Sequence, residues 1–100
     1  MKAFKVITAS FRSGPKLSHE WKIGQWHRLN VPLEMDLRNV YYKNGFFSAS
    51  SRELAFKRLP IWLLNEPNLT YVEVELGGDI KEDETVPGVF VSTEMKIVKE

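Results

Sequence analysis

The clearest alternation of apolar and polar residues lies in the segment 70–76 (TYVEVEL). Every second residue there is aliphatic, beginning with Val72, which is typical of a strand with one buried and one solvated face. Gly77 and Gly78 follow at once, so we expect the strand to end there. The segment 79–88 (DIKEDETVPG) then predicts an acidic loop.

Other segments predict strands with less regular patterns. The run 2–8 (KAFKVIT) is rich in β-forming residues and indicates a first, largely buried strand. The segment 19–30 (HEWKIGQWHRLN) predicts a short strand pair that turns at Gly24. The segment 31–45 predicts a half-buried strand closed by a turn at its last two residues, and 89–100 supplies one or two final strands.

A capping box predicts the start of a helix. Ser50 stands three residues before Glu53, a spacing at which each side chain bonds the backbone N–H of the other residue. We expect the helix over about residues 51–59, because Pro60 cannot continue it, with a second short turn to about residue 64. The predicted fold is therefore α+β, a mostly antiparallel sheet with one principal helix.

The composition is that of one soluble globular domain. Of the 100 residues, 43% are hydrophobic and 27% charged, so we expect a single domain over residues 1–100. The chain has no cysteine, which excludes disulfides and thiolate chemistry and fits a reducing cytoplasm. No apolar run has the length of a signal peptide core or a membrane span, so we expect a cytoplasmic protein without a membrane partner.

The charges are distributed unevenly along the chain. Residues 1–62 carry 11 Lys and Arg against 4 Asp and Glu, whereas residues 63–100 carry 3 against 9. One interpretation is a basic face for phosphate-rich partners opposite an acidic edge. We favour the other, in which the two halves interleave and neutralise each other, because neither half is long enough for a core of its own.

Histidines and tryptophans gather in the segment 19–30. His19 and His27 are the only histidines, and no further ligand stands near them at metal-ligand spacing, so we predict no metal site.

Aromatic and basic residues also alternate there. Trp21 and Trp26, with Lys22 and Arg28, suggest a surface on which unpaired bases stack, which makes a single-strand nucleic-acid binder one functional hypothesis. The alternative, which we favour, places the tryptophans in the core or against a partner protein.

Three features in order suggest an enzyme. Arg12, the Ser48-Ala49-Ser50 run and Glu73-Val74-Glu75 loosely resemble the arginine, Ser-Thr-Ser and Glu-x-Glu pattern of ADP-ribosyltransferases. The resemblance implies that Glu75 and Ser48 are catalytic and that Arg12 and Ser50 hold a nicotinamide dinucleotide. The chain is much shorter than those domains, and alanine replaces the threonine. The simpler interpretation puts both glutamates on the solvated face of a strand.

A second resemblance covers roughly residues 20–100. The segments 45–59 (GFFSASSRELAFKRL), 70–80 (TYVEVELGGDI) and 92–100 (STEMKIVKE) together resemble small uncharacterised domains of bacteria and their phages. In those domains a Gly-Phe-His/Phe strand leads into a helix. This chain has Phe47 where many of them have histidine, and the family implies no activity.

The leading hypothesis is a small intracellular, non-enzymatic binding or accessory protein that needs no cofactor. It rests on the lack of a nucleophile–base pair, metal cluster or phosphate loop in the sequence, and its partner would be a protein or a nucleic acid. An ADP-ribosyltransferase-like enzyme is the alternative. Ser48 is the residue of the strand–helix joint that the capping box leaves unexplained, and the two hypotheses differ in whether it shares a cleft with Glu75.

Overall fold

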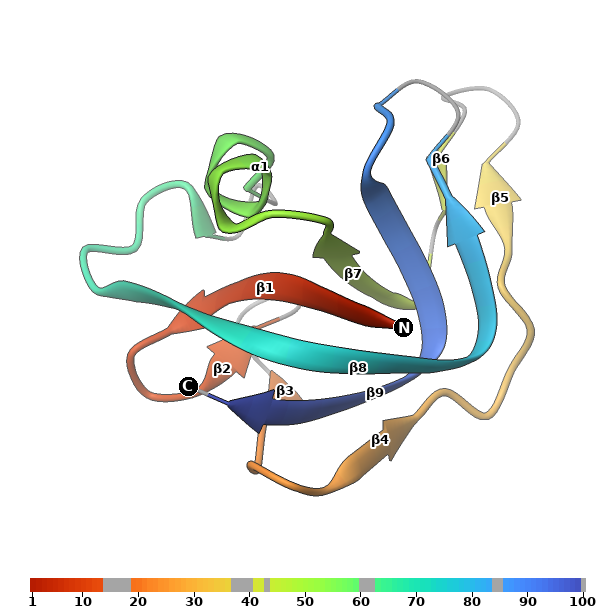
Figure 1. Cartoon of the computed structure of the whole chain (residues 1–100), viewed down its shortest axis with the longest axis horizontal. Helices are drawn as coiled ribbons and strands as arrows, with labels where there is room; N and C mark the ends of the chain where they lie inside the picture. The colour runs from red at the N-terminus through yellow and green to blue at the C-terminus, as the bar shows by residue number, and fades with distance from the viewer. Residues whose placement is uncertain (14–18, 37–40, 43, 60–62, 84–85, 100) are drawn as a thin grey trace.

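The fold is mostly antiparallel sheet with one short helix in the part of the chain that the computed structural model describes, residues 1–13, 19–36, 41–42, 44–59, 63–83 and 86–99 (Figure 1). The strands are β1 (Lys2–Thr8), β2 (Arg12–Ser13), β3 (His19–Glu20), β4 (Trp26–Arg28), β5 (Met35–Asp36), β6 (Tyr41–Tyr42), β7 (Phe46–Ala49), β8 (Leu69–Glu82) and β9 (Val89–Lys99), and the helix is α1 (Arg52–Lys57).

Four strands close into a ring. The main sheet has the order β4-β9-β7-β1-β8, and β8 pairs with β9 as well, so the pairings run β9-β7-β1-β8 and back to β9. The two long strands make this closure possible, because each bends and serves different neighbours along its length (Figure 1). A closed sheet has an inside and an outside, which separates the core into two parts.

The inside of the ring holds the main core. Alternate residues of β1, β8 and β9 point inward with a tryptophan from the β3–β4 segment: Ala3, Ile7, Trp21, Val72, Val74, Leu76, Met95 and Ile97. The alternation predicted for residues 70–76 is thus confirmed, since Val72, Val74 and Leu76 are all buried.

The strand containing these residues is longer than predicted. We expected it to end at Gly77, with residues 79–88 as an acidic loop, but β8 continues to Glu82 and pairs with β9 along that extension. The prediction was wrong because the two glycines form an irregularity inside the strand instead of a turn after it. Gly78 takes a φ of +65°, and the N–H of Asp79 is satisfied by the Thr93 hydroxyl at 2.9 Å.

The helix covers a smaller core on the outside of the ring, built from Val6, Ala49, Ala55 and Leu63. It starts one residue later than the capping box predicts: Ser51 is the N-cap, and its hydroxyl accepts from the Leu54 N–H at 3.1 Å. It also ends before residue 59. Residues 60–62 of the predicted second turn lie outside the described residues.

The segment around Gly24 turns as predicted but pairs differently. Gly24 has a φ of +81° and lies in a turn. The predicted strand pair is wrong, however, because β3 pairs with β2 and β4 pairs with β9. The alternating segment that follows contributes β5, which pairs with β6, and residues 37–40 between them are outside the described part.

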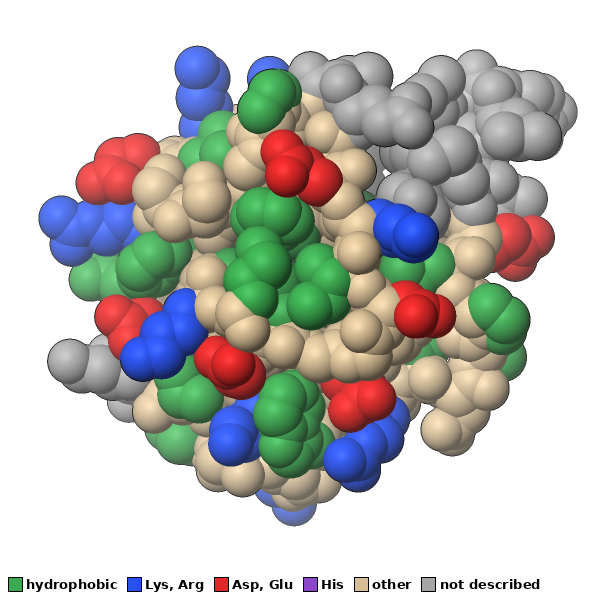
Figure 2. All heavy atoms as spheres, turned by 45° about the vertical axis from the view of Figure 1, so that its right-hand side comes forward, with side chains coloured by type: hydrophobic (Ala, Val, Ile, Leu, Met, Phe, Trp, Pro, Cys, Tyr) green, Lys and Arg blue, Asp and Glu red, His purple; other side chains and the backbone are tan. Residues whose placement is uncertain are grey.

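Strands from the basic and acidic parts of the chain lie side by side. Lys2 of β1 stands opposite Glu75 of β8, and Arg28 of β4 contacts Glu94 of β9 at 3.3 Å. Acidic and basic side chains are accordingly intermixed over the face in Figure 2. These contacts support the interleaved arrangement of charges. Among the described residues, no helix is both long and apolar enough to cross a membrane.

Candidate binding pocket

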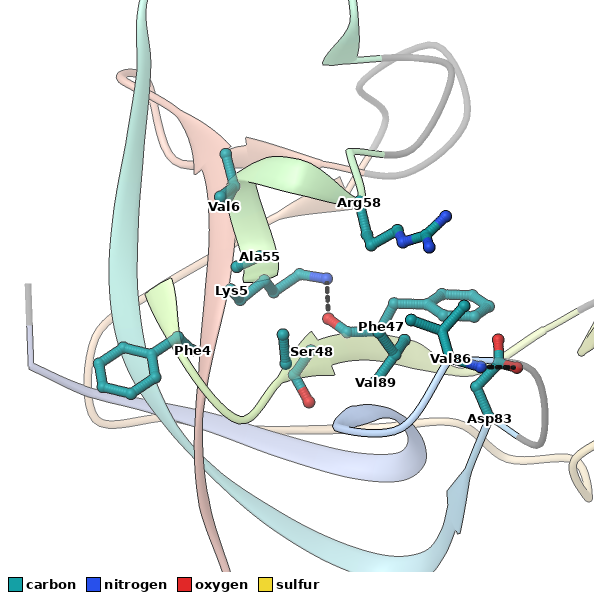
Figure 3. A pocket seen from close by; sticks show the side chains of 11 residues that line it. Phe4, Lys5, Val6, Phe47, Ser48, Ala55, Arg58, Asp83, Val86 and Val89 are labelled. Carbon is teal, nitrogen blue, oxygen red and sulfur yellow. Dashed lines mark hydrogen bonds between the residues drawn. The ribbon is translucent and has the colours of Figure 1, made fainter. Parts of the chain in front are cut away.

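A pocket of about 330 Å³ opens beside the strand–helix joint (Figure 3). It lies between α1, the adjoining parts of β1 and β7, and the β8–β9 turn. The lining residues are Phe4, Lys5, Val6, Phe47, Ser48, Ala49, Ala55, Arg58, Asp83, Val86 and Val89. Most of these side chains are apolar, so a few polar groups decide what the pocket accepts.

The pocket forms where β1 and β7 part. Their register contains one pair, Phe4 opposite Ala49, in the described chain. Beyond it the carbonyl oxygen of Phe47 receives a hydrogen bond at 2.8 Å from the side-chain amine of Lys5 (Figure 3). The side-chain amine of Lys5 thus replaces a backbone N–H as the donor to this carbonyl at the seam, the place where β1 and β7 part. A buried carbonyl needs such a donor.

Lys5 is a buried amine. It shares the inward face of β1 with Ala3 and Ile7, is 8% exposed, and holds its Nζ 5.5 Å from the centre of the Trp21 ring. Burial lowers the pKa of its amine from 10.5 to about 8, because the charged form loses water that the protein does not replace. Within the described part of the chain, no carboxylate forms an ion pair with it.

Ser48 is the second polar group at the seam. It precedes Ala49, the β7 residue of the Phe4–Ala49 pair, and it lines the pocket. It is 6% exposed, and its Oγ has no hydrogen-bond partner among the described residues. A buried hydroxyl left in this state costs about 1–3 kcal/mol.

Charged side chains mark the rim. Arg58 follows the last turn of α1, is exposed, and extends toward the same side of the pocket as Lys5 (Figure 3). No ion pair of Arg58 occurs in the described residues. Across the opening, the Asp83 carboxylate accepts from the Val86 N–H at 3.2 Å and so shapes the β8–β9 turn. The pocket therefore presents two cations and one anion.

Ser48 is the one residue of the predicted enzyme site that lines this pocket. Glu75 lies elsewhere on β8, where its carboxylate accepts from the amino group of Met1 at 2.9 Å. That hydrogen bond lowers the pKa of Glu75. The structure therefore does not bring Ser48 and Glu75 into one cavity.

The two residues predicted to hold a dinucleotide are also apart from the pocket. Arg12 lies on β2 and contacts Glu20 of β3 at 3.4 Å through its guanidinium. Ser50 is exposed, and its backbone N–H donates to the carbonyl of Gly88 at 2.7 Å. Both residues have structural roles that need no ligand.

One tryptophan of the nucleic-acid hypothesis is not available at the surface. Trp21 is 2% exposed, and its indole N–H donates to the Ser13 hydroxyl at 2.6 Å, so its ring belongs to the core. Trp26 is half-buried on β4 with the amine of Lys96 5.1 Å from its ring centre. Arg28 of this set is paired with a carboxylate on β9, and Lys22 is exposed.

The two histidines meet, which their spacing of eight residues did not indicate. Nε2 of His19 lies 3.0 Å from Nδ1 of His27, and both rings contact the Trp21 ring. Burial is the main cause that lowers the pKa of each histidine, and the partner ring contributes for His19. No group of three or more potential metal ligands occurs among the described residues.

Sequence reasoning missed Lys5, although the signal was present. Lysine occupies the inward position between Ala3 and Ile7 in a strand that otherwise reads as buried. A charged residue at such a position is rare unless it is paired or functional.

Comparisons with protein-family models, with curated proteins and with solved structures find no match for this chain.

Proposed function

We propose that this chain is a non-enzymatic binding domain whose pocket takes a small organic acid with an apolar body. The observation that carries the proposal is the buried amine of Lys5, which faces a pocket and has no ion-pair partner in the described chain. A buried ammonium is costly without an opposite charge, and a ligand carboxylate would supply one.

The rest of the pocket suits such a ligand. Arg58 provides a second cation with a planar donor group that matches a carboxylate. The apolar side chains of Val86 and Val89 line the pocket and would contact the hydrocarbon part. The acidic Asp83 at the rim favours a ligand with a single carboxylate over one with several.

Amide NMR spectra recorded during titration with acetate, butyrate and benzoate test the proposal. We expect saturable shifts at residues 47–49 and around Arg58, with affinity rising along the series as more apolar surface is buried. Arg58→Gln should weaken butyrate binding about tenfold, a loss of about 1.4 kcal/mol.

Arg52→Gln is the matched control. It removes the same charge from the opposite end of α1, but Arg52 contacts Glu53 and Tyr71 outside the pocket, so affinity should not change. Equal losses in both variants would show that only net charge matters, and spectra without saturable shifts would refute the pocket.

The other functional hypotheses stay predictions. No contact or distance in the described part of the chain supports a protein or nucleic-acid partner, an ADP-ribosyltransferase-like activity or a cytoplasmic location. The resemblance to small bacterial and phage domains likewise stays a prediction.

A further inference from the structure

We infer that Lys5 binds its ligand covalently, by forming a reversible imine with a small oxo acid, a carboxylate that also carries an aldehyde or ketone carbon. This inference rests on the proposed function, because it places the acid of the ligand in the same pocket. It adds a reason why a lysine, and not an arginine, stands at the seam between β1 and β7.

The first argument is the position of the amine. Lys5 Nζ is held by one hydrogen bond, to the carbonyl of Phe47 at 2.8 Å, and the side chain lines the pocket. An ammonium has three donors and a neutral amine keeps a lone pair, so this hydrogen bond and the Trp21 ring 5.5 Å away position the amine and leave it able to react. The side of the pocket across from the amine carries the apolar side chains of Val86 and Val89 as well as the Asp83 carboxylate.

The second argument is the protonation state. Only a neutral amine attacks a carbonyl carbon, and desolvation is a known means of activating a lysine for imine formation. With its pKa near 8, Lys5 has about one-tenth of its amine neutral at neutral pH. That fraction is about 200 times larger than for an ordinary exposed lysine.

The chemistry needs no further reagent. The lone pair of Nζ attacks the carbonyl carbon, a C–N bond forms as the C=O π bond breaks, and one of the two amine protons moves to the carbonyl oxygen. The resulting carbinolamine then loses its hydroxyl group as water, the second proton leaves the nitrogen, and a C=N bond remains. No atom is oxidised or reduced, and hydrolysis reverses the step.

The second cation of the pocket assists the step. Arg58 at the rim holds the carboxylate and orients the carbonyl carbon toward the amine.

Trapping with cyanoborohydride tests the inference on the full chain. The protein is incubated at neutral pH with glyoxylate and the reductant, which converts an imine to a stable secondary amine, and modified lysines are located by peptide mass mapping. We expect Lys5 to be modified at least about tenfold faster than exposed Lys57, because its larger neutral fraction outweighs its restricted access. Excess butyrate should slow Lys5 and leave Lys57 unchanged.

Three variants test whether the fast modification depends on Lys5 and on the cation at the rim of the pocket. Lys5→Arg retains the charge but cannot form an imine, so the fast modification should disappear. Arg58→Gln should slow Lys5 about tenfold, whereas Arg52→Gln should not. Modification of lysines in order of exposure would overturn the inference. If butyrate still bound in the NMR titration, the proposed function would survive that result, and if butyrate did not bind, both would fail.

Discussion

Lys5 is a residue whose effect on stability depends on pH. Its pKa is about 8 in the folded protein and about 10.5 in the unfolded chain. Between these values the unfolded chain binds a proton that the folded protein does not, so stability rises with pH. Below pH 8 both states are protonated, and burial of the charge destabilises the fold by about 3 kcal/mol.

Lys5→Met should therefore stabilise the protein at neutral pH and destabilise it at high pH. Methionine removes the burial cost but leaves the Phe47 carbonyl without its donor, which costs about 1–2 kcal/mol. We expect a net gain of about 1–2 kcal/mol at neutral pH, and a loss of about 1–2 kcal/mol above pH 10, where the wild-type amine is neutral.

Urea unfolding of both proteins from neutral pH to above pH 10 measures this change of sign. Because all other titrating groups are shared, the difference between the two free energies of unfolding isolates Lys5. A difference independent of pH would mean that the Lys5 amine keeps an ordinary pKa.

At the scale of elements, the helix shows how far a local pattern reaches. The serine and glutamate spacing correctly placed a helix after β7, because capping depends on neighbours in sequence. It indicated Ser50, because Glu53 stands three residues after it, whereas the residue three positions after Ser51 is Leu54. The structure nevertheless has Ser51 as the N-cap. What separates them is the contact of Ser50 with Gly88, which is 38 positions away and invisible locally.

Ser51→Ala should cost about 1 kcal/mol of stability, because it leaves the Leu54 N–H without its hydroxyl acceptor. Ser50→Ala is the control, and we expect a change below about 0.5 kcal/mol, since its structural contact is made by the backbone. Chemical denaturation of both variants measures the difference. A larger effect at Ser50 would restore the capping box predicted from the sequence.

Two adjacent glycines in the sequence signalled the irregularity in β8, but they did not show which kind of structure it is. Two adjacent glycines indicate either a turn or a bulge, and only the pairing of both sides with β9 decides between them. The alternation before the glycines was readable because one face is buried. The extension after them carries mainly polar residues, so it gave no signal.

Gly78→Ala should destabilise the protein more than Gly24→Ala. Both glycines have positive φ, which costs alanine about 1 kcal/mol. At Gly24 an added methyl group meets nothing within 4 Å, whereas at Gly78 it collides with the Thr93 hydroxyl. We expect an additional 1–3 kcal/mol or so at Gly78, because Thr93 is held by its bond from Asp79. Equal costs in urea unfolding would show that β8 relaxes freely there.

At the scale of the whole molecule, the ring could not be read from the sequence. Strands β1 and β8 are separated by about 60 positions, and alternation shows which face of a strand is buried but not which strand lies beside it. The pocket has the same origin, since it exists only where β1 and β7 part under α1. The pattern thus predicted many elements and left both closure and site open.

The ring closure makes each half of the chain dependent on the other. Residues 1–62 contain β1 and β7 without β8 and β9, and residues 63–100 contain β8 and β9 with their inner face uncovered. A two-stranded hairpin is at best marginally stable in water. We therefore expect fragment 1–62 to be unfolded alone, and a mixture of the two fragments to recover strand structure.

Tryptophan fluorescence can follow this recovery, because all three tryptophans lie in residues 1–62. Emission of that fragment should shift to shorter wavelength on mixing, as Trp21 enters a core shared with Met95 and Ile97. The halves carry opposite net charge, so added salt should weaken the association. A second fragment with Val74→Asp, which places a charge in the core, should not complement. Cooperative unfolding of fragment 1–62 by itself would show that the ring is not the unit of stability.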